Sequence, residues 1–119
     1  MKLKNILLAV NNIEQSKTFY HDLFGLDVIA DFGNNIILTE GLVLQERHKW
    51  NQLIGKNSIQ GNGDCELYFE EGNFDSFLIK LESYPKPIEI LNPVAQNSMR
   101  QRYLRIYDPD YHIIEIKES

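Results

Sequence analysis

The sequence has 119 residues, with 12 lysines and arginines against 17 aspartates and glutamates and a formal net charge of −5. This length fits one domain, and a composition of 43% apolar and 24% charged residues is typical of a globular protein. The negative charge argues against a nucleic-acid partner, whose phosphates must be neutralised. No apolar run is long enough to cross a membrane, and the single cysteine, Cys65, has no internal disulfide partner, so we expect a cytoplasmic protein with no membrane partner.

The first part of the chain predicts the element order β-α-β-β-β. Residues 3–10 form a short apolar run that favours a strand. Asn12 has a side chain typical of a helix N-cap, apolar residues recur at helical spacing from Ile13 to Phe24, and Gly25 ends this helix. Three more strands are expected over residues 26–32, 35–39 and 42–46, separated by the turn signals at 33–34 and 40–41.

Residues 47–64 interrupt this pattern and are predicted to form a connector with a short helix around residues 50–54. The segment is rich in Gly, Asn, Lys and Gln, and connections of this length are often functional. Trp50 is its candidate ligand-binding residue, because an indole can close over a cavity as a flat apolar lid. The alternative is that Trp50 covers the core or a dimer contact.

The remaining residues repeat the first order of elements. Residues 65–70 alternate as in a half-buried strand, and Asn73 is a second N-cap before a helix predicted over residues 74–83. Strands are expected over residues 88–94, 102–107 and 112–117, with a strong turn signal at residues 108–111.

A constant offset relates the two halves. The caps Asn12 and Asn73 differ by 61 positions, as do the helix anchors Ile13 and Phe74. An internal repeat of this size indicates two units that each leave a sheet face to be covered. We therefore predict an α+β fold in which two βαβββ units, residues 1–46 and 65–119, form a curved, mostly antiparallel, cup-shaped sheet in a single domain over residues 1–119.

Two motifs resemble those of the vicinal oxygen chelate superfamily, which includes glyoxalases, bleomycin-resistance proteins and extradiol dioxygenases. The first runs from Val10 to Tyr20 and continues into Leu23-Phe24-Gly25-Leu26, and the second runs from Tyr107 to Ile116. The resemblance covers nearly the whole chain in order and spacing. It implies a glyoxalase-like cup, a small-molecule ligand and a homodimer.

The resemblance also implies four positions that hold a divalent metal in the metal-dependent relatives. Here these positions are Asn5, Gln45, Glu66 and Glu115, two from each unit, with Gln45 and Glu115 regarded as equivalent because each is the fourth residue from the start of its strand after the turn. Glu115, Glu66 and Gln45 are the metal-ligand candidates, and an all-oxygen set favours Mg²⁺, Mn²⁺ or Ca²⁺ over Zn²⁺. Asn5 departs from the histidine or glutamine usual in the family, so one divalent ion and no metal are both open alternatives.

Glu66 and Glu115 are also candidate catalytic residues without a metal. Two carboxylates in one cavity raise the pKa of one of them, which suits general acid or base chemistry near neutral pH. The alternative is that Arg102 or Arg105 pairs with one of them as an ordinary ion pair.

Alternation along the strands selects two further ligand-binding candidates beside Asn5 and Gln45. Tyr68 shares a strand face with Glu66, and Arg105 shares one with Tyr103 and Tyr107. Mixed aromatic and polar walls are typical of small-molecule pockets.

These candidates leave two functions open. The first is a metal-dependent lyase, isomerase or thiol transferase that acts on a small metabolite. The second is a metal-free protein that binds or sequesters a small molecule such as a drug, and the short side chain of Asn5 favours this alternative.

Overall fold

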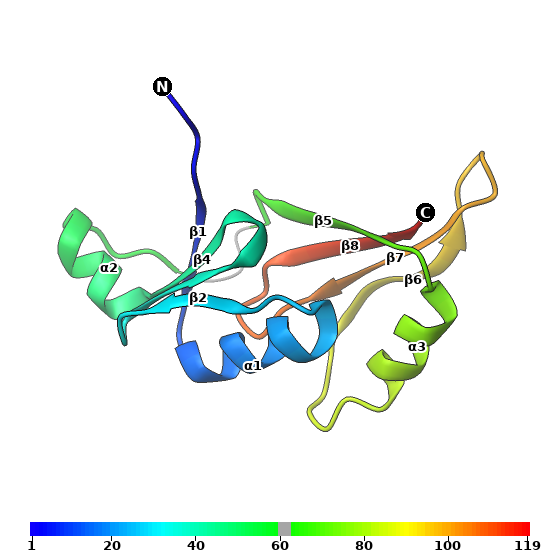
Figure 1. Ribbon diagram of the computed structural model, residues 1–119, viewed down its shortest axis with the longest axis horizontal. Helices are drawn as coiled ribbons and strands as arrows, with labels where there is room; N and C mark the ends of the chain where they lie inside the picture. Colours follow the sequence, from blue (N-terminus) through cyan, green and yellow to red (C-terminus); the bar gives the residue numbers. More distant parts are fainter. Residues whose placement is uncertain (60–62) are drawn as a thin grey trace. The chain divides into compact units, whose positions relative to one another are not determined.

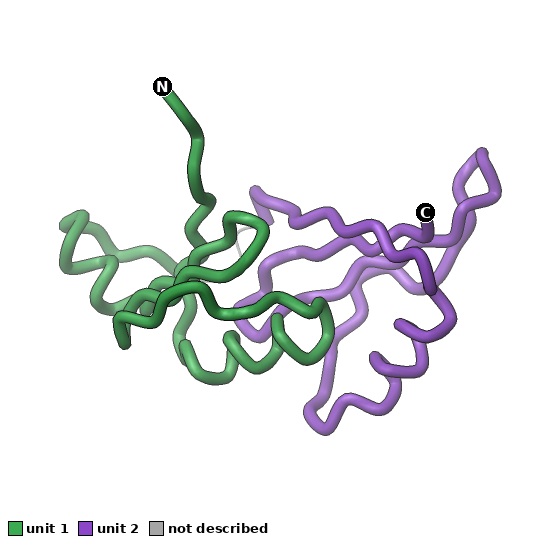
Figure 2. The backbone as a smooth tube through the Cα atoms, viewed as in Figure 1, with its two compact units in different colours: residues 1–60 green, residues 61–119 purple. Residues whose placement is uncertain are grey.

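The structure, a computed structural model, describes residues 1–59 and 63–119. Gln60, Gly61 and Asn62, which belong to the predicted connector, lie outside the described residues. The chain divides into two compact units, Met1–Gln60 and Gly61–Ser119, coloured separately in Figure 2. No helix in the described part of the chain is long and apolar enough to cross a membrane.

Unit 1 consists of one mixed sheet and two helices (Figure 1). Its sheet has the order β1-β4-β3-β2, in which β1 runs parallel to β4 and the other pairs are antiparallel. In chain order its elements are β1 (Ile6–Val10), α1 (Ile13–Phe24), β2 (Val28–Asp31), β3 (Asn35–Leu38), a 3₁₀ turn (Thr39–Gly41), β4 (Leu42–Glu46) and α2 (Arg47–Ile54).

Unit 2 repeats the same topology. Its sheet has the order β5-β8-β7-β6, again with one parallel pair, β5 and β8, and two antiparallel pairs. Its elements are β5 (Glu66–Glu71), α3 (Phe74–Glu82), β6 (Ile90–Gln96), β7 (Arg102–Tyr107) and β8 (Ile113–Glu118). The predicted α+β fold of two βαβββ units is confirmed, with two mixed four-stranded sheets.

The N-caps that define the repeat are present in both units. The side-chain oxygen of Asn12 accepts the backbone N–H of Gln15 at 3.1 Å, and that of Asn73 accepts the N–H of Ser76 at 3.1 Å. Each bond satisfies one N–H that the first turn of a helix leaves without a partner. Gly25 ends α1 in the left-handed region at φ 68°, a conformation that costs glycine little.

Several element boundaries differ from the prediction, and β2 is shorter at both ends, at Val28–Asp31 rather than residues 26–32. β1 begins at Ile6 rather than residue 3, because its pairing with β4 starts at Ile6 and Leu42. α2 begins at Arg47 rather than residue 50, because the Glu46 carboxylate accepts the backbone N–H groups of His48 and Lys49 and so caps an earlier first turn. β6 spans residues 90–96 rather than 88–94.

One face of each sheet is apolar and carries the core. In unit 1, α1 buries Phe19, Tyr20 and Leu23 with the sheet residues Leu8, Val10, Ile36, Leu38 and Leu44. In unit 2, Phe74 and Phe77 of α3 are buried together with Leu104, Ile106, Ile114 and Ile116. Because side chains alternate along a strand, the odd-numbered residues of β7 and β8 lie on the opposite face of the unit 2 sheet.

Candidate functional site

The face of the unit 2 sheet opposite its core is lined with polar and aromatic side chains. Tyr68, Glu115, Arg105 and Asn92 are direct neighbours in the pairing register of β5, β8, β7 and β6, so they form one row across the whole sheet. The adjacent rows add Glu66 on one side and Glu70, Lys117 and Tyr103 on the other. We call these eight residues the polar face: Glu66, Tyr68, Glu70, Asn92, Tyr103, Arg105, Glu115 and Lys117.

Arg105 is at the centre of the polar face and pairs with both candidate carboxylates. Its Nε donates to Glu66 Oε1 at 2.8 Å, and its Nη2 lies 2.5 Å from Glu115 Oε1. Its Nη1 donates to the Asn92 side-chain oxygen at 3.1 Å. Each of the three guanidinium nitrogens therefore already contacts an acceptor.

These contacts hold the guanidinium in its charged state. Hydrogen bonding to Glu66, followed by the charges of Glu115 and Glu66, raises the pKa of Arg105 above its already high usual value, although partial burial opposes the increase. The side chains of Arg105 and Glu115 are 31% and 15% exposed, so this pair is partly shielded from water. Arg105 thus carries a positive charge at neutral pH, next to Glu66 and Glu115.

Two tyrosine rings of the polar face each have a cationic side chain over the ring. The Arg105 guanidinium lies 5.5 Å from the centre of the Tyr103 ring, and Lys117 Nζ lies 5.8 Å from the centre of the Tyr68 ring. Contact with Tyr68, followed by the charges of Glu70 and Glu115, raises the pKa of Lys117. Tyr68 remains 48% exposed, and its hydroxyl donates to Glu70 at 3.4 Å.

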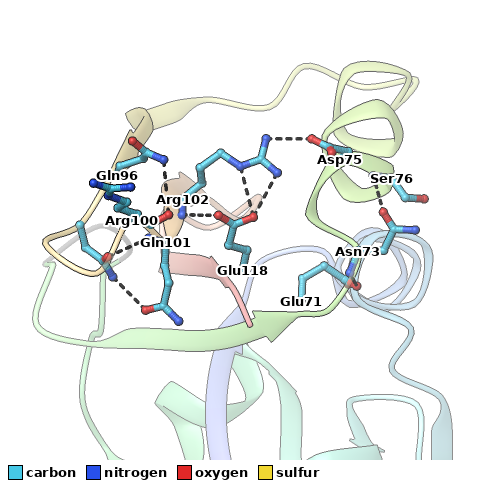
Figure 3. Close-up of polar contacts among 10 residues, drawn as sticks. Glu71, Asn73, Asp75, Ser76, Gln96, Arg100, Gln101, Arg102 and Glu118 are labelled. Carbon is cyan, nitrogen blue, oxygen red and sulfur yellow. Dashed lines mark hydrogen bonds and ion pairs between the residues drawn. The ribbon is translucent and has the colours of Figure 1, made fainter.

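Arg102, the other arginine considered as a partner of the carboxylates, lies on the opposite side of the sheet. Figure 3 shows its guanidinium between Asp75 of α3 and Glu118 of β8, at 2.8 Å and 3.1 Å. The same guanidinium lies 5.0 Å from the centre of the Phe74 ring. Arg102 therefore secures the first turn of α3, and Arg105 alone serves the polar face among the arginines of β7.

The two candidates from unit 1 have different surroundings. Asn5 is exposed before the start of β1, and its side-chain nitrogen donates to the Gly41 carbonyl at 3.4 Å. Gln45 is buried, accepts from the Asn35 side chain at 2.9 Å and donates to the Glu46 carbonyl at 3.3 Å. Convergence of Asn5 and Gln45 with Glu66 and Glu115 on one cavity stays a prediction.

The pairing register corrects one step of the sequence argument. Glu115 pairs with Tyr68, whereas Gln45 pairs with Ala9. Leu7 is the equivalent of Tyr68 by the offset of 61, and Leu7 pairs with Val43. The equivalent of Glu115 in unit 1 is therefore Val43, and Gln45 lies two residues further along its strand.

Trp50 lies half-buried on α2, which packs beside β1 and β4 in unit 1. Arg47, at the start of the same helix, donates to the Ala9 carbonyl at 2.9 Å, to Asn11 at 2.8 Å and to Ser58 at 3.0 Å. These bonds attach the helix and the following segment to the end of β1. The role of Trp50 as a lid stays a prediction.

The topology and the sequence together decide the family. The family model described as glyoxalase-like domain matches residues 3–119. The chain belongs to the glyoxalase-like family. Solved structures of the glyoxalase, bleomycin resistance and dioxygenase family, at 14% identity in the Burkholderia phytofirmans protein, share its fold.

Solved structures share the fold of this chain. A protein of unknown function from Agrobacterium tumefaciens is 32% identical, with a TM-score of 0.86, and the match covers 100% of this chain and 94% of that one. A glyoxalase-related enzyme from Fulvimarina pelagi is 19% identical, with a TM-score of 0.82 over 99% and 88% of the two chains. The fosfomycin resistance protein FosX from Listeria monocytogenes is 16% identical, with a TM-score of 0.76 over 100% and 93%. The last two show likeness of fold alone.

The residues of this glyoxalase-like chain do not fit the divalent metal that the family implies. Glu66 and Glu115 both face a guanidinium that already neutralises part of their charge. The unit 1 position equivalent to Glu115 is Val43, which has no donor atom. Within the described residues, no group of three or more His, Cys, Asp or Glu side chains is placed to hold a metal ion.

Sequence reasoning missed four members of the polar face, Glu70, Asn92, Tyr103 and Lys117. The sequence predicts a strand at Asn92 but gives no role for its side chain, whose oxygen accepts from Arg105. It also predicts strands at Tyr103 and Lys117 but not the cation–ring contacts that these residues make. Alternation could have put Tyr103, Arg105, Glu115 and Lys117 on one face, but only the register shows which of them are neighbours.

Proposed function

We propose that this glyoxalase-like protein binds a small organic molecule on the polar face of unit 2 without using a metal ion. The observation that carries the proposal is Arg105, whose guanidinium contacts Glu66, Glu115 and Asn92 at once. Small-molecule sites combine a few placed polar groups with aromatic side chains, and here the polar groups lie beside the exposed ring of Tyr68. Such a protein would sequester its ligand in the cytoplasm.

A metal-dependent lyase, isomerase or thiol transferase is the second candidate. It is favoured by the fact that Glu66 and Glu115, from two different strands, approach the same point. For a metal to use both carboxylates, Arg105 would have to give up both ion pairs. The two candidates therefore predict opposite responses to a divalent ion.

Thermal unfolding with Mn²⁺ or Mg²⁺ separates these candidates, because an ion bound only by the folded state raises Tm. For the metal-free protein we expect no change in Tm with either ion. Replacing Arg105 by Gln leaves two carboxylates without their cation, so Arg105→Gln should acquire a positive Tm shift with Mn²⁺.

Arg102→Gln is the matched control, because it also removes an arginine with two carboxylate partners but on the other side of the sheet. Its Tm should stay insensitive to Mn²⁺. An increase in the Tm of the unaltered protein with Mn²⁺, abolished by Glu115→Gln, would contradict the metal-free proposal and favour the enzyme.

We also propose that two copies form a C₂ dimer, the commonest closed assembly. The proposal is supported by β6, an outer strand of the unit 2 sheet, on which Ile90, Leu91 and Val94 are 43%, 36% and 45% exposed. Multi-angle light scattering should give twice the chain mass, and a monomer mass across the accessible concentrations would overturn the proposal.

A further inference from the structure

We infer that the ligand of the polar face is an organic cation, an amine or amidine. This inference rests on the proposed function, since it names the class of molecule that the same site takes. Three independent properties of the polar face lead to it: its balance of charge, its balance of hydrogen-bonding capacity and its exposed ring.

The balance of charge on the polar face is negative. On β5, β7 and β8 it carries three carboxylates, Glu66, Glu70 and Glu115, against two cations, Arg105 and Lys117. One negative charge is therefore left over, on a chain whose formal net charge is −5. A cationic ligand is drawn to such a surface and an anionic ligand is repelled from it.

The polar face has more free hydrogen-bond acceptors than free donors, which favours a ligand that donates hydrogen bonds. Every nitrogen of Arg105 is already directed at an acceptor, so an incoming carboxylate or phosphate would have to compete with Glu66, Glu115 and Asn92. A carboxylate has room for about four donors. The contacts of Glu66 and Glu115 with Arg105 both use Oε1, which leaves each carboxylate with acceptor capacity for an ammonium or amidinium group.

The aromatic rings supply the third property. Tyr68 and Tyr103 each already have a cationic group from the protein over the ring. Tyr68 is 48% exposed and lies between Glu66 and Glu70 on one face of β5, so its ring and two carboxylates are presented together. Attraction of a cation by an aromatic ring, combined with carboxylates at its edge, selects an organic cation over a neutral molecule of the same shape.

Chemical-shift titrations of the ¹⁵N-labelled full chain with three matched probes test this inference. The probes are benzylammonium, benzyl alcohol and benzoate, which share a ring and differ in charge. We expect benzylammonium to shift the amides of β5, β7 and β8 and to bind about tenfold more tightly than benzyl alcohol, with no binding of benzoate. Glu66→Gln and Tyr68→Leu should each weaken benzylammonium binding severalfold.

Glu82→Gln is the control, since Glu82 is an exposed carboxylate of α3 and does not belong to the polar face. It should leave the affinity unchanged, and the spectra of all variants report whether the fold is kept. Equal or tighter binding of benzyl alcohol or benzoate on the same strands would overturn the cation inference and leave the proposed function in place. Shifts by benzylammonium that are unaffected by Glu66→Gln would overturn the inference as well, and no shift of these strands by any probe would contradict the proposed function itself.

Discussion

Arg102 and Arg105 lie three residues apart on β7 and do different work because that spacing puts them on opposite faces of the sheet. Arg102 joins the first turn of α3 to the end of β8 through Asp75 and Glu118. Arg105 joins Glu66 and Glu115 on the polar face. One arginine therefore stabilises α3 on the core face of the sheet, and the other organises the candidate site on the polar face.

The Arg102 cluster predicts a specific dependence of stability on pH. Arg102 lowers the pKa of Asp75 and of Glu118 from their usual values of 3.8 and 4.5. Because these carboxyl groups bind protons more readily in the unfolded chain, their contribution is present at neutral pH and is lost as the pH falls below about 5. Arg102→Gln should therefore be less stable at neutral pH and lose less stability between about pH 5 and pH 3.

Urea unfolding at a series of pH values measures this effect. The slope of the unfolding free energy against pH in the acid range should be smaller for Arg102→Gln than for the unaltered protein. Equal slopes would show that the two carboxyl groups are not coupled to Arg102. Lys80→Gln, which removes an exposed cation of α3 from outside this cluster, is a suitable control for the change in net charge.

At the scale of elements, the two sheets share a scaffold and differ in chemistry. The central row of unit 2 is Tyr68, Glu115, Arg105 and Asn92, and the equivalent row of unit 1 is Leu7, Val43, Ile37 and Ala30. An irregularity follows Val28 in β2 and recurs after Ile90 in β6, so even a local departure from regular pairing is repeated. The repeat thus preserved the backbone while only unit 2 acquired charged residues at the centre of this face.

The repeated N-caps give a prediction for both helices. Asn12→Ala and Asn73→Ala should each lower the free energy of unfolding by about 1 kcal/mol, because each removes the acceptor of one N–H in the first helical turn. Replacement by Asp at either position keeps an acceptor and should restore most of the loss. Chemical denaturation of the four variants is the measurement, and alanine variants as stable as the unaltered protein would contradict the capping role.

For the whole molecule, much of the fold followed from local patterns. Both long helices, the turns and the repeat could be predicted because periodicity, caps and turn residues act over a few positions. The sequence could not show whether Gln45 and Glu115 occupy equivalent positions in the two units. A shift of two residues in strand pairing keeps every side chain on the same face, so the alternation of apolar and polar residues does not reveal it. The two ion pairs of Arg105, with Glu66 and Glu115, could not be predicted either. Alternation along a strand shows which side chains share a face, but it does not show which residues of neighbouring strands lie side by side.

The central claim is that the Arg105 guanidinium lies between Glu66 and Glu115 in place of a metal ion, and that the site binds its ligand without a metal. Paramagnetic broadening by Mn²⁺ in the ¹⁵N–¹H spectrum tests it most directly, because a bound Mn²⁺ ion would selectively weaken the amide signals of the residues around it. At substoichiometric Mn²⁺ we predict that the amide signals of Tyr68 and Glu115 keep their intensity in the unaltered protein and lose it in Arg105→Gln. Selective loss of these signals in the unaltered protein would contradict the account.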